Sequence, residues 1–331
     1  MNVKSFLLSA SACAFLATSG ILQADPERAA GEWKTMASVP DQRTEVSVTT
    51  DGELIYLIGG FKLADDGSGH AVAPREMFAY NPEDDSWFQQ GEILQGVNHA
   101  GFVGYEGKLY IIGGYQENTF NAIGHVRIYD IAEETWSEGA SMITPRGALK
   151  LAEVNGKIHA IGGTAAGEGS VGTHEVYDPQ ADSWETLATM PTGRDHLAVI
   201  AIDGKIYVSA GRAGGNFTMT ETEIYDPAED SWSTGAPMPT GRSGVAEVNH
   251  RGRFYVFGGE VFGDSPKTFD EAERYDPETD SWQQLPPMPT ARHGLGAASI
   301  GDHIYVISGG PQPGFAFGDA NERLTPEDTE N

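Results

Sequence analysis

The feature that most constrains this chain is an internal repeat that occurs six times. Six tryptophans each precede a pair of small residues by 26 positions, and five tyrosines each precede the next tryptophan by seven. The tryptophans are Trp33, Trp87, Trp136, Trp184, Trp232 and Trp282, and the pairs are Gly59-Gly60, Gly113-Gly114, Gly162-Gly163, Ala210-Gly211, Gly258-Gly259 and Ser308-Gly309. Such fixed spacing indicates modular units that bury their apolar faces against one another.

Within one unit the apolar and polar residues alternate as they do in half-buried strands. In the fourth unit the runs HLAVIAI, KIYVSA, ETEIYDP and SWSTG predict four strands, which we call a to d. Asp203-Gly204 between the first two runs is suited to a tight hairpin turn. Segments with helical periodicity and N-caps are missing from the sequence, so we expect an all-β fold.

The runs IYLIGG, LYIIGG and FYVFGG, followed by Tyr and Trp at fixed spacing, resemble the kelch repeat. The resemblance covers nearly all of the chain after residue 24 and implies a six-bladed β-propeller of four-stranded antiparallel blades around a channel. The sixth unit ends at its third strand, Asn321–Leu324, and the first tryptophan, Trp33, has no third strand before it. We therefore expect the N-terminal strand to complete the last blade, which would leave no open sheet edge.

Residues 1–24 have the features of a secretory signal peptide. Lys4 supplies a positive charge, the stretch from Phe6 to Ala17 is mostly apolar, and Ala24 offers a cleavage site before Asp25. We expect export to the periplasm or the extracellular space without stable membrane insertion, and a single propeller domain over residues 25–331. Cleavage would remove Cys13, the only cysteine of the chain.

Charge and motifs exclude several classes of function. The chain has 48 acidic against 21 basic residues, a net charge of −27, so nucleic acid would be repelled. The acidic turns between strands c and d lack the ligand spacing of a calcium loop, and the GxGxxG string at 167–172 leads into a strand rather than a helix. We expect no metal and no cofactor, and a monomeric protein.

Arginine recurs where the loop between strands d and a enters the innermost strand. The residues 16 positions before each small pair are Arg43, Val97, Arg146, Arg194, Arg242 and Arg292. Guanidinium groups bind carboxylates and phosphates well, so five of them around one axis would form an anion-binding funnel. The alternative is that each arginine braces nearby loop carbonyls or pairs with an acid, and repetition alone does not decide between the two.

Two further signals fall on the same face. All length variation lies between the small pair and the third strand, in the b–c loops, and variable loops on a rigid scaffold often carry binding. Glu45, His99, His196 and His293 lie one or two residues after the arginine position. If they converge, they could transfer a proton at a sugar carbon.

Two functional hypotheses follow. The first is a non-catalytic binding module that recognises an acidic protein segment or an anionic glycan through the five arginines with His99, His196 and His293. The second is an epimerase or mutarotase of an acidic sugar, by analogy with the N-acetylneuraminate epimerase family, which is similar in blade type and size. A copper radical oxidase like galactose oxidase is excluded, because that centre needs a Tyr–Cys crosslink and the sequence after residue 24 has no cysteine.

Overall fold

The computed structural model describes residues 29–327, and over that range it contains strands and turns but no helix. Its main elements are six four-stranded antiparallel sheets. The first sheet has the order β2 (Ser47–Thr50), β3 (Ile55–Ile58), β6 (Glu76–Asn81), β7 (Ser86–Glu92), and the second β9 (Gly101–Tyr105), β10 (Lys108–Ile112), β12 (Val126–Asp130), β13 (Thr135–Gly139). The third has the order β15 (Lys150–Val154), β16 (Lys157–Ile161), β19 (His174–Asp178), β20 (Ser183–Thr186), and the fourth β21 (Ala198–Ile202), β22 (Lys205–Ser209), β23 (Thr222–Asp226), β24 (Ser231–Gly235). The fifth has the order β25 (Ala246–His250), β26 (Arg253–Phe257), β29 (Ala272–Asp276), β30 (Ser281–Gln284).

The sixth sheet joins the two ends of the described chain. Its order is β31 (Gly296–Ile300), β32 (His303–Ile307), β33 (Asn321–Pro326), β1 (Gly31–Thr35). Trp33 on β1 lies opposite Leu324 on β33, in the same register that places Trp232 opposite Tyr225 in the fourth sheet. The indole of Trp33 donates to the Pro286 carbonyl oxygen at 3.0 Å.

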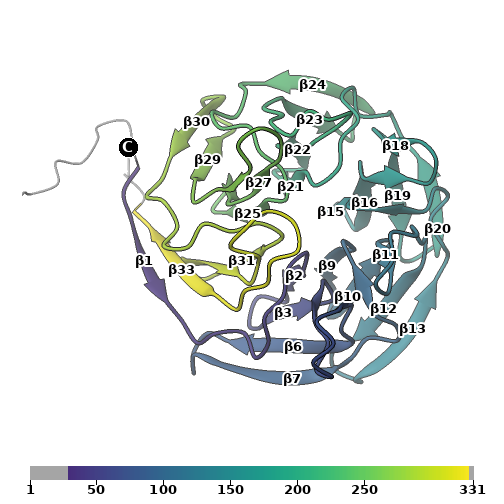
Figure 1. Cartoon of the computed structure of the whole chain (residues 1–331). Helices are drawn as coiled ribbons and strands as arrows, with labels where there is room; N and C mark the ends of the chain where they lie inside the picture. Colours follow the sequence, from purple (N-terminus) through teal and green to yellow (C-terminus); the bar gives the residue numbers. More distant parts are fainter. Residues whose placement is uncertain (1–28, 328–331) are drawn as a thin grey trace, which may run out of the picture.

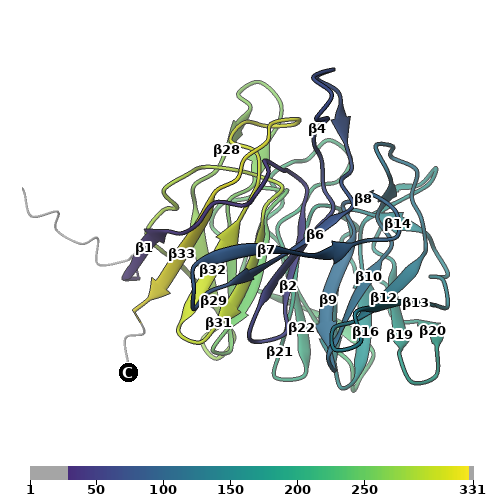
Figure 2. The same ribbon diagram turned by 90° about the horizontal axis from the view of Figure 1, so that it is seen from below.

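The sheets surround a central axis, with their first strands innermost and their last strands at the rim (Figure 1). Each first strand contacts the first strand of the next sheet, and β31 contacts β2. The b–c loops stand together at one end of the sheets (Figure 2). They and the d–a loops carry short strands: β4 (Lys62–Leu63), β5 (Ala71–Val72), β8 (Val97–Asn98), β11 (Tyr115–Gln116), β14 (Arg146–Gly147), β17 (Thr164–Ala165), β18 (Gly169–Ser170), β27 (Glu260–Val261) and β28 (Lys267–Thr268).

The hydrophobic core lies between adjacent sheets, because each sheet presents apolar residues on both faces. One cluster joins Tyr110 and Ile112 of the second sheet to Ile158 and Tyr177 of the third. The strand-c tyrosine hydroxyls of the first five sheets are hydrogen-bonded, as buried phenols generally are, and Leu324 takes the tyrosine position in the sixth sheet. The expected all-β architecture is confirmed, and so are the four strands expected in the fourth unit.

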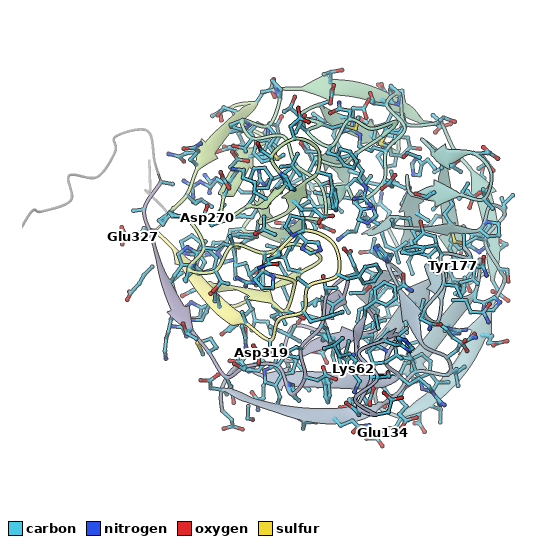
Figure 3. All side chains as sticks on the ribbon, viewed as in Figure 1. Lys62, Glu134, Tyr177, Asp270, Asp319 and Glu327 are labelled. Atoms are coloured by element: carbon cyan, nitrogen blue, oxygen red, sulfur yellow. The ribbon has the colours of Figure 1, made fainter. Side chains whose placement is uncertain are left out.

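The recurring Tyr, Asp and Trp join four of the sheets to the preceding one. Asp182 accepts hydrogen bonds from the Tyr177 hydroxyl at 2.7 Å and from the Ala140 amide of the second sheet at 2.6 Å, while Trp184 donates to the Ala140 carbonyl at 2.7 Å. The same three contacts recur at the first, fourth and fifth sheets. Glu134 takes the aspartate position in the second sheet, at the rim, whereas Tyr177 lies further inward (Figure 3).

The small pair allows close backbone approaches between loops. A Cβ on Gly60 would lie 2.3 Å from the Thr44 carbonyl oxygen of its own d–a loop, and one on Gly59 would lie 2.3 Å from the Val97 carbonyl of the next loop. Both glycines also have positive φ. The repeated pair is therefore explained by packing.

The expected signal peptide, residues 1–24, lies outside the described residues. Over residues 29–327, no helix is long and apolar enough to span a membrane.

Two buried histidines between the third and fourth sheets make stability depend on pH. The His174 Nδ1–H points at the Ala188 carbonyl, 3.3 Å away, so its Nε2 accepts from His159 Nδ1 at 2.8 Å. Burial lowers the pKa of His159 to about 4 and that of His174 to about 3, so both are neutral in the folded protein at pH 7. In the unfolded chain both take up protons below the ordinary pKa of about 6.5.

Stability from this pair is therefore complete above about pH 6.5 and is lost as the pH falls towards the folded pKa values. We expect each histidine to account for about 3 kcal/mol, and the pair for roughly 6 kcal/mol, of the loss in the free energy of unfolding between pH 7 and pH 4. Urea titrations of the double variant His159→Leu/His174→Leu should show a pH dependence weaker by that amount. An unchanged pH dependence would show that these histidines are not held neutral.

Candidate functional site

The five arginines expected to face the channel mouth are buried instead. Arg43, Arg146, Arg194, Arg242 and Arg292 have at most 1% of their surface exposed. Arg242 is typical: its Nε donates to the Gly258 carbonyl at 2.6 Å, and its Nη1 donates to the Thr240 carbonyl at 2.7 Å and to the buried carboxylate of Glu273. Its guanidinium thus ties the d–a loop to the small pair and to strand c.

Each of the other arginines has an acidic partner as well. The carboxylates lie on strand c in four sheets, whereas Arg43 pairs with Asp41 of its own loop at 2.6 Å. The strand-c pairs are Arg146–Glu175, Arg194–Glu223, Arg242–Glu273 and Arg292–Glu322. The expectation that these side chains are presented to a ligand is therefore not met, because burial and internal pairing leave them no free surface. Their contacts fit the bracing alternative.

The residue two positions after the arginine position faces the axis in every sheet. These six residues are Glu45, His99, Ala148, His196, Gly244 and Gly294, and all have φ between 52° and 66°. Gly294 has no room for a side chain, because a Cβ there would lie 2.6 Å from the Glu45 amide nitrogen. At Glu45, His99 and His196 the left-handed backbone is costly for a residue with a Cβ, so these polar side chains point to function.

The structure brings together the four candidates Glu45, His99, His196 and His293. The Glu45 carboxylate lies 3.2 Å from His99 Nε2, 4.0 Å from His196 Nε2 and 3.6 Å from His293 Nε2. At most 7% of each imidazole and 14% of the Glu45 side chain are exposed. Residues from four sheets therefore form one cluster on the axis, which we call the axial cluster.

Hydrogen bonds fix the tautomer of each imidazole. His99 Nδ1 lies 2.6 Å from the Asn98 Oδ1, His196 Nδ1 lies 2.5 Å from the Asp195 Oδ1, and His293 Nδ1 lies 3.1 Å from the Gly310 carbonyl. All three oxygens are acceptors. For Asn98 the side-chain amide nitrogen donates to the Glu117 carbonyl at 2.6 Å, so the atom that faces His99 is the oxygen. Each Nδ1 therefore carries a proton, and each Nε2 is directed at Glu45.

Three further residues, Asp195, Arg212 and Glu260, contact the axial cluster and were not predicted from the sequence. Arg212 donates to Asp195 at 3.0 Å, to Glu260 at 3.3 Å and to His196 Nε2 at 3.1 Å. Arg212 and Glu260 both directly follow a small pair, and each pairs in a β-bridge with the residue after an arginine position, Asp195 and Ser243. Comparing the residues that follow the six small pairs would have shown that this position varies and is charged in two units.

Burial and neighbouring charge act in opposite directions on the central pair. Burial by itself would raise the pKa of Glu45, but attraction to His99, His196, His293 and Arg212 outweighs it and lowers the pKa to about 2. Burial lowers the pKa of His99 to about 3, against the opposing effect of Glu45. At neutral pH this contact therefore joins a carboxylate to a neutral imidazole.

Burial and neighbouring charge also compete at Asp195 and Glu260, with opposite net effects on their pKa values. Burial would raise the pKa of Asp195, but the hydrogen bond from His196 and the charge of Arg212 hold it well below its usual range. Burial raises the pKa of Glu260 despite attraction to His293, and the nearby charge of Glu45 adds to the rise. Proton affinity therefore rises across the cluster from Asp195 to Glu260.

A cavity of about 140 Å³ lies above the axial cluster, and Glu45, His99, His196, Arg212 and Glu260 form its polar lining. Its walls are aromatic and come from loops of several sheets: Phe61, Phe120, Phe262 and Phe315. Phe61 contacts both Phe120 and Phe315, with ring centroids 6.3 and 5.3 Å apart. Phe120 and Phe315 are 62% and 61% exposed, which is unusual for large apolar side chains.

The charge of the cavity floor also differs from the expectation of a basic funnel. Two carboxylates of the lining, Glu45 and Glu260, accompany one guanidinium, that of Arg212, which also pairs with Asp195, and the five predicted arginines are buried against other acids. The floor therefore favours a cation or a neutral group over an anion.

Comparison with known proteins agrees with the repeat and the fold. A family model described as the KLHDC2/KLHL20/DRC7 Kelch-repeats domain matches residues 141–310, just over half of the chain, and a Kelch motif model matches residues 97–143. Similar proteins include Kelch-like protein terF of Aspergillus terreus, 29% identical over 49% of this chain and 36% of that protein. Kelch repeat and BTB domain-containing protein 13 of Homo sapiens is 28% identical over 38% of this chain and 26% of that protein.

Kelch-like ECH-associated protein 1A of Danio rerio is 30% identical over 34% of this chain and 18% of that protein. The matches thus span about a third or less of these relatives' own length. With the six repeats, the four-stranded sheets and a family match over half of its length, the chain belongs to the kelch-repeat family.

Proposed function

We propose that this chain is a kelch-type binding module that recognises a protein segment in the aromatic-walled cavity on the axis. Kelch domains bind proteins, and the observation that carries the proposal is a cavity at the meeting point of the b–c and d–a loops. Exposed phenyl rings around a polar floor are typical of binding sites, in which aromatic contacts supply most of the energy.

The segment we propose inserts an apolar or aromatic side chain between Phe120 and Phe315. A basic or neutral polar group on the same segment would meet the carboxylates of the floor. This proposal replaces the acidic segment or anionic glycan expected from the arginine positions, since those arginines are paired internally.

The proposed scaffold is a six-bladed propeller closed by the N-terminal strand, which holds the loops of the cavity at fixed positions. The pairing of β1 with β33 and the contact of β31 with β2 support it. Export through residues 1–24 and a monomeric state remain parts of the proposal that rest on the sequence.

Replacing Phe120 and Phe315 together by aspartate should abolish most binding at the cavity. Peptides selected from a random display library against the full chain supply the ligand. We expect the double variant to bind them at least 30-fold more weakly, the effect of losing a binding hot spot of about 2 kcal/mol. Titration calorimetry measures the affinity.

The matched control is Phe88→Asp, which changes an exposed phenylalanine on β7 at the rim. It should leave both peptide affinity and melting temperature unchanged. Equal loss of binding in the control, or full binding by the double variant, would place the recognition surface elsewhere.

A second candidate function is proton transfer on a small sugar, because Glu45, His99 and His196 line the cavity and the buried imidazole of His293 lies 3.6 Å from the Glu45 carboxylate. The acidic floor favours a neutral sugar over the acidic one expected from the epimerase analogy. Exchange of solvent deuterium into sugars incubated with the protein, and its loss in Glu45→Gln, tests this alternative. If the wild-type protein catalyses no exchange, the candidate is rejected.

A further inference from the structure

Three side chains of the axial cluster bring unprotonated donor atoms to one point. His99 and His196 direct their Nε2 atoms at the Glu45 carboxylate, and one donor atom of each residue lies within 4.8 Å of the other two. Because each Nδ1 donates to its outer acceptor, Nε2 is the ring atom left to bind a cation. The His99 Nε2 lies 3.2 Å from a carboxylate oxygen, so a cation between them, a proton or a metal ion, relieves their repulsion.

Each imidazole is oriented by an outer hydrogen bond of the kind that supports metal ligands. Asn98 holds the Nδ1–H of His99, and it is fixed by the Glu117 carbonyl. Asp195 holds the Nδ1–H of His196, and it is fixed by Ser170 and Arg212. These outer hydrogen bonds, and not the contacts repeated in every unit, orient the two rings with Nε2 towards Glu45.

The fold itself does not need these side chains. Ala148 and Gly244 occupy the same left-handed position in the third and fifth sheets. A glycine would adopt this backbone without strain, so Glu45, His99 and His196 keep a Cβ at a cost of roughly 1 kcal/mol each. Such strain at three neighbouring positions is expected where the side chains have a ligand.

We propose that Glu45, His99 and His196 bind one divalent first-row transition-metal ion on the propeller axis. Two imidazole nitrogens and one carboxylate with open coordination positions suit Fe²⁺, Mn²⁺, Co²⁺ or Zn²⁺. The open positions face the cavity, which these three residues line. The inference goes beyond peptide recognition and does not depend on it.

A second group, Glu45, Glu260 and His293, also lies within 4.8 Å and shares the Glu45 carboxylate. It offers only one nitrogen, and a backbone amide, that of Gly314, already donates to the Glu260 Oε2 that faces His293. The first group is the better site for a transition metal, because it offers two imidazole nitrogens, each oriented by an outer hydrogen bond.

Arg212 would compete with the proposed ion for His196 Nε2. Its Nη2 donates to His196 Nε2 at 3.1 Å, and its charge repels a cation. The side chain is 24% exposed and has room to turn towards the cavity. Removing the guanidinium should therefore strengthen metal binding, whereas removal of a merely structural residue would not.

The test uses the full chain, freed of metal by dialysis against a chelator and titrated with Co²⁺ while visible absorption is recorded. We expect one Co²⁺ per chain, with d–d bands that report nitrogen and oxygen ligands. His99→Ala, His196→Ala and Glu45→Gln should each weaken binding more than tenfold, and Asp195→Asn by about tenfold. Arg212→Met should tighten binding several-fold.

The control is His70→Ala, which changes an exposed histidine and should bind Co²⁺ within threefold of wild type. His293→Ala removes a neighbour of Glu45 from the second group and should weaken binding less than His99→Ala does. Thermal melts should show that all variants fold, as alanine at position 148 suggests. Absence of stoichiometric Co²⁺ binding would overturn the proposal. A greater loss in His293→Ala than in His99→Ala, or weaker binding by Arg212→Met, would overturn the ligand set.

Discussion

Replacing Arg242 by alanine is expected to lower the free energy of unfolding by about 3 to 5 kcal/mol. The change leaves the carboxylate of Glu273, which has no exposed surface, without its guanidinium partner, and it removes the donors to the Gly258 and Thr240 carbonyls. An unpaired buried charge costs far more than a lost surface ion pair. Urea unfolding followed by tryptophan fluorescence measures the change.

The double variant Arg242→Met/Glu273→Leu is the matched control, because it removes both charges and keeps the volume. It should recover much of the lost stability, since apolar replacements of buried pairs are often tolerated. Peptide affinity of the folded protein should be unchanged in both variants. If Arg242→Ala kept full stability and lost peptide binding, the arginine would be a ligand-binding residue and the bracing account would be wrong.

Deleting residues 29–38 should lower the free energy of unfolding by roughly 5 kcal/mol or more, because the deletion removes the packing of a tryptophan and a whole strand ladder. The change removes β1, exposes the edge of β33 and leaves the ring of Phe257 without the indole of Trp33, 5.9 Å away. For a chain of this size we expect a melting temperature lower by at least about 10 °C.

Lys34→Ala on the same strand is the control, since this side chain is exposed and should contribute little. A synthetic peptide of residues 29–38 added in excess should restore part of the lost stability. A deletion variant as stable as the full chain would contradict closure of the propeller by the N-terminal strand.

The strands were predictable because their signals are local and repeated. Alternation placed β21 to β24 in the fourth unit, and the missing tryptophan of the sixth unit predicted the partner of Trp33. Tyr, Trp and the small pair recur because each makes the same contact between sheets. A requirement that repeats five or six times is visible in one sequence without any relatives.

The role of the arginines was harder to predict, because spacing shows that a residue recurs but not which way it points. A further signal was present: glutamate lies two residues before the strand-c aromatic or leucine in the four units whose arginine it pairs with. In the second unit, where Val97 replaces the arginine, that position is Arg127. The glutamate accompanies the arginine in four units, and both are replaced in the second unit, which favours an internal ion pair over a ligand site.

The axial cluster could be predicted only in part. Glu45, His99, His196 and His293 follow the arginine position closely, so the topology brings them to the axis. Asp195, Arg212 and Glu260 join them through bridges between the d–a loops and the residues after the small pairs. These bridges join residues 17 positions apart in every unit, but the side chains at the two positions differ from unit to unit, so the spacing does not show which of them carry charge.

Hydrogen–deuterium exchange of the full chain, with and without a selected peptide, tests most directly whether the axial cavity is the recognition site. We predict protection in the loops that line it, namely 44–46, 115–123, 212–218, 260–268 and 310–318, with unchanged exchange in the c–d turns at the opposite end. Protection confined to the c–d turns or to the rim strands would contradict the account.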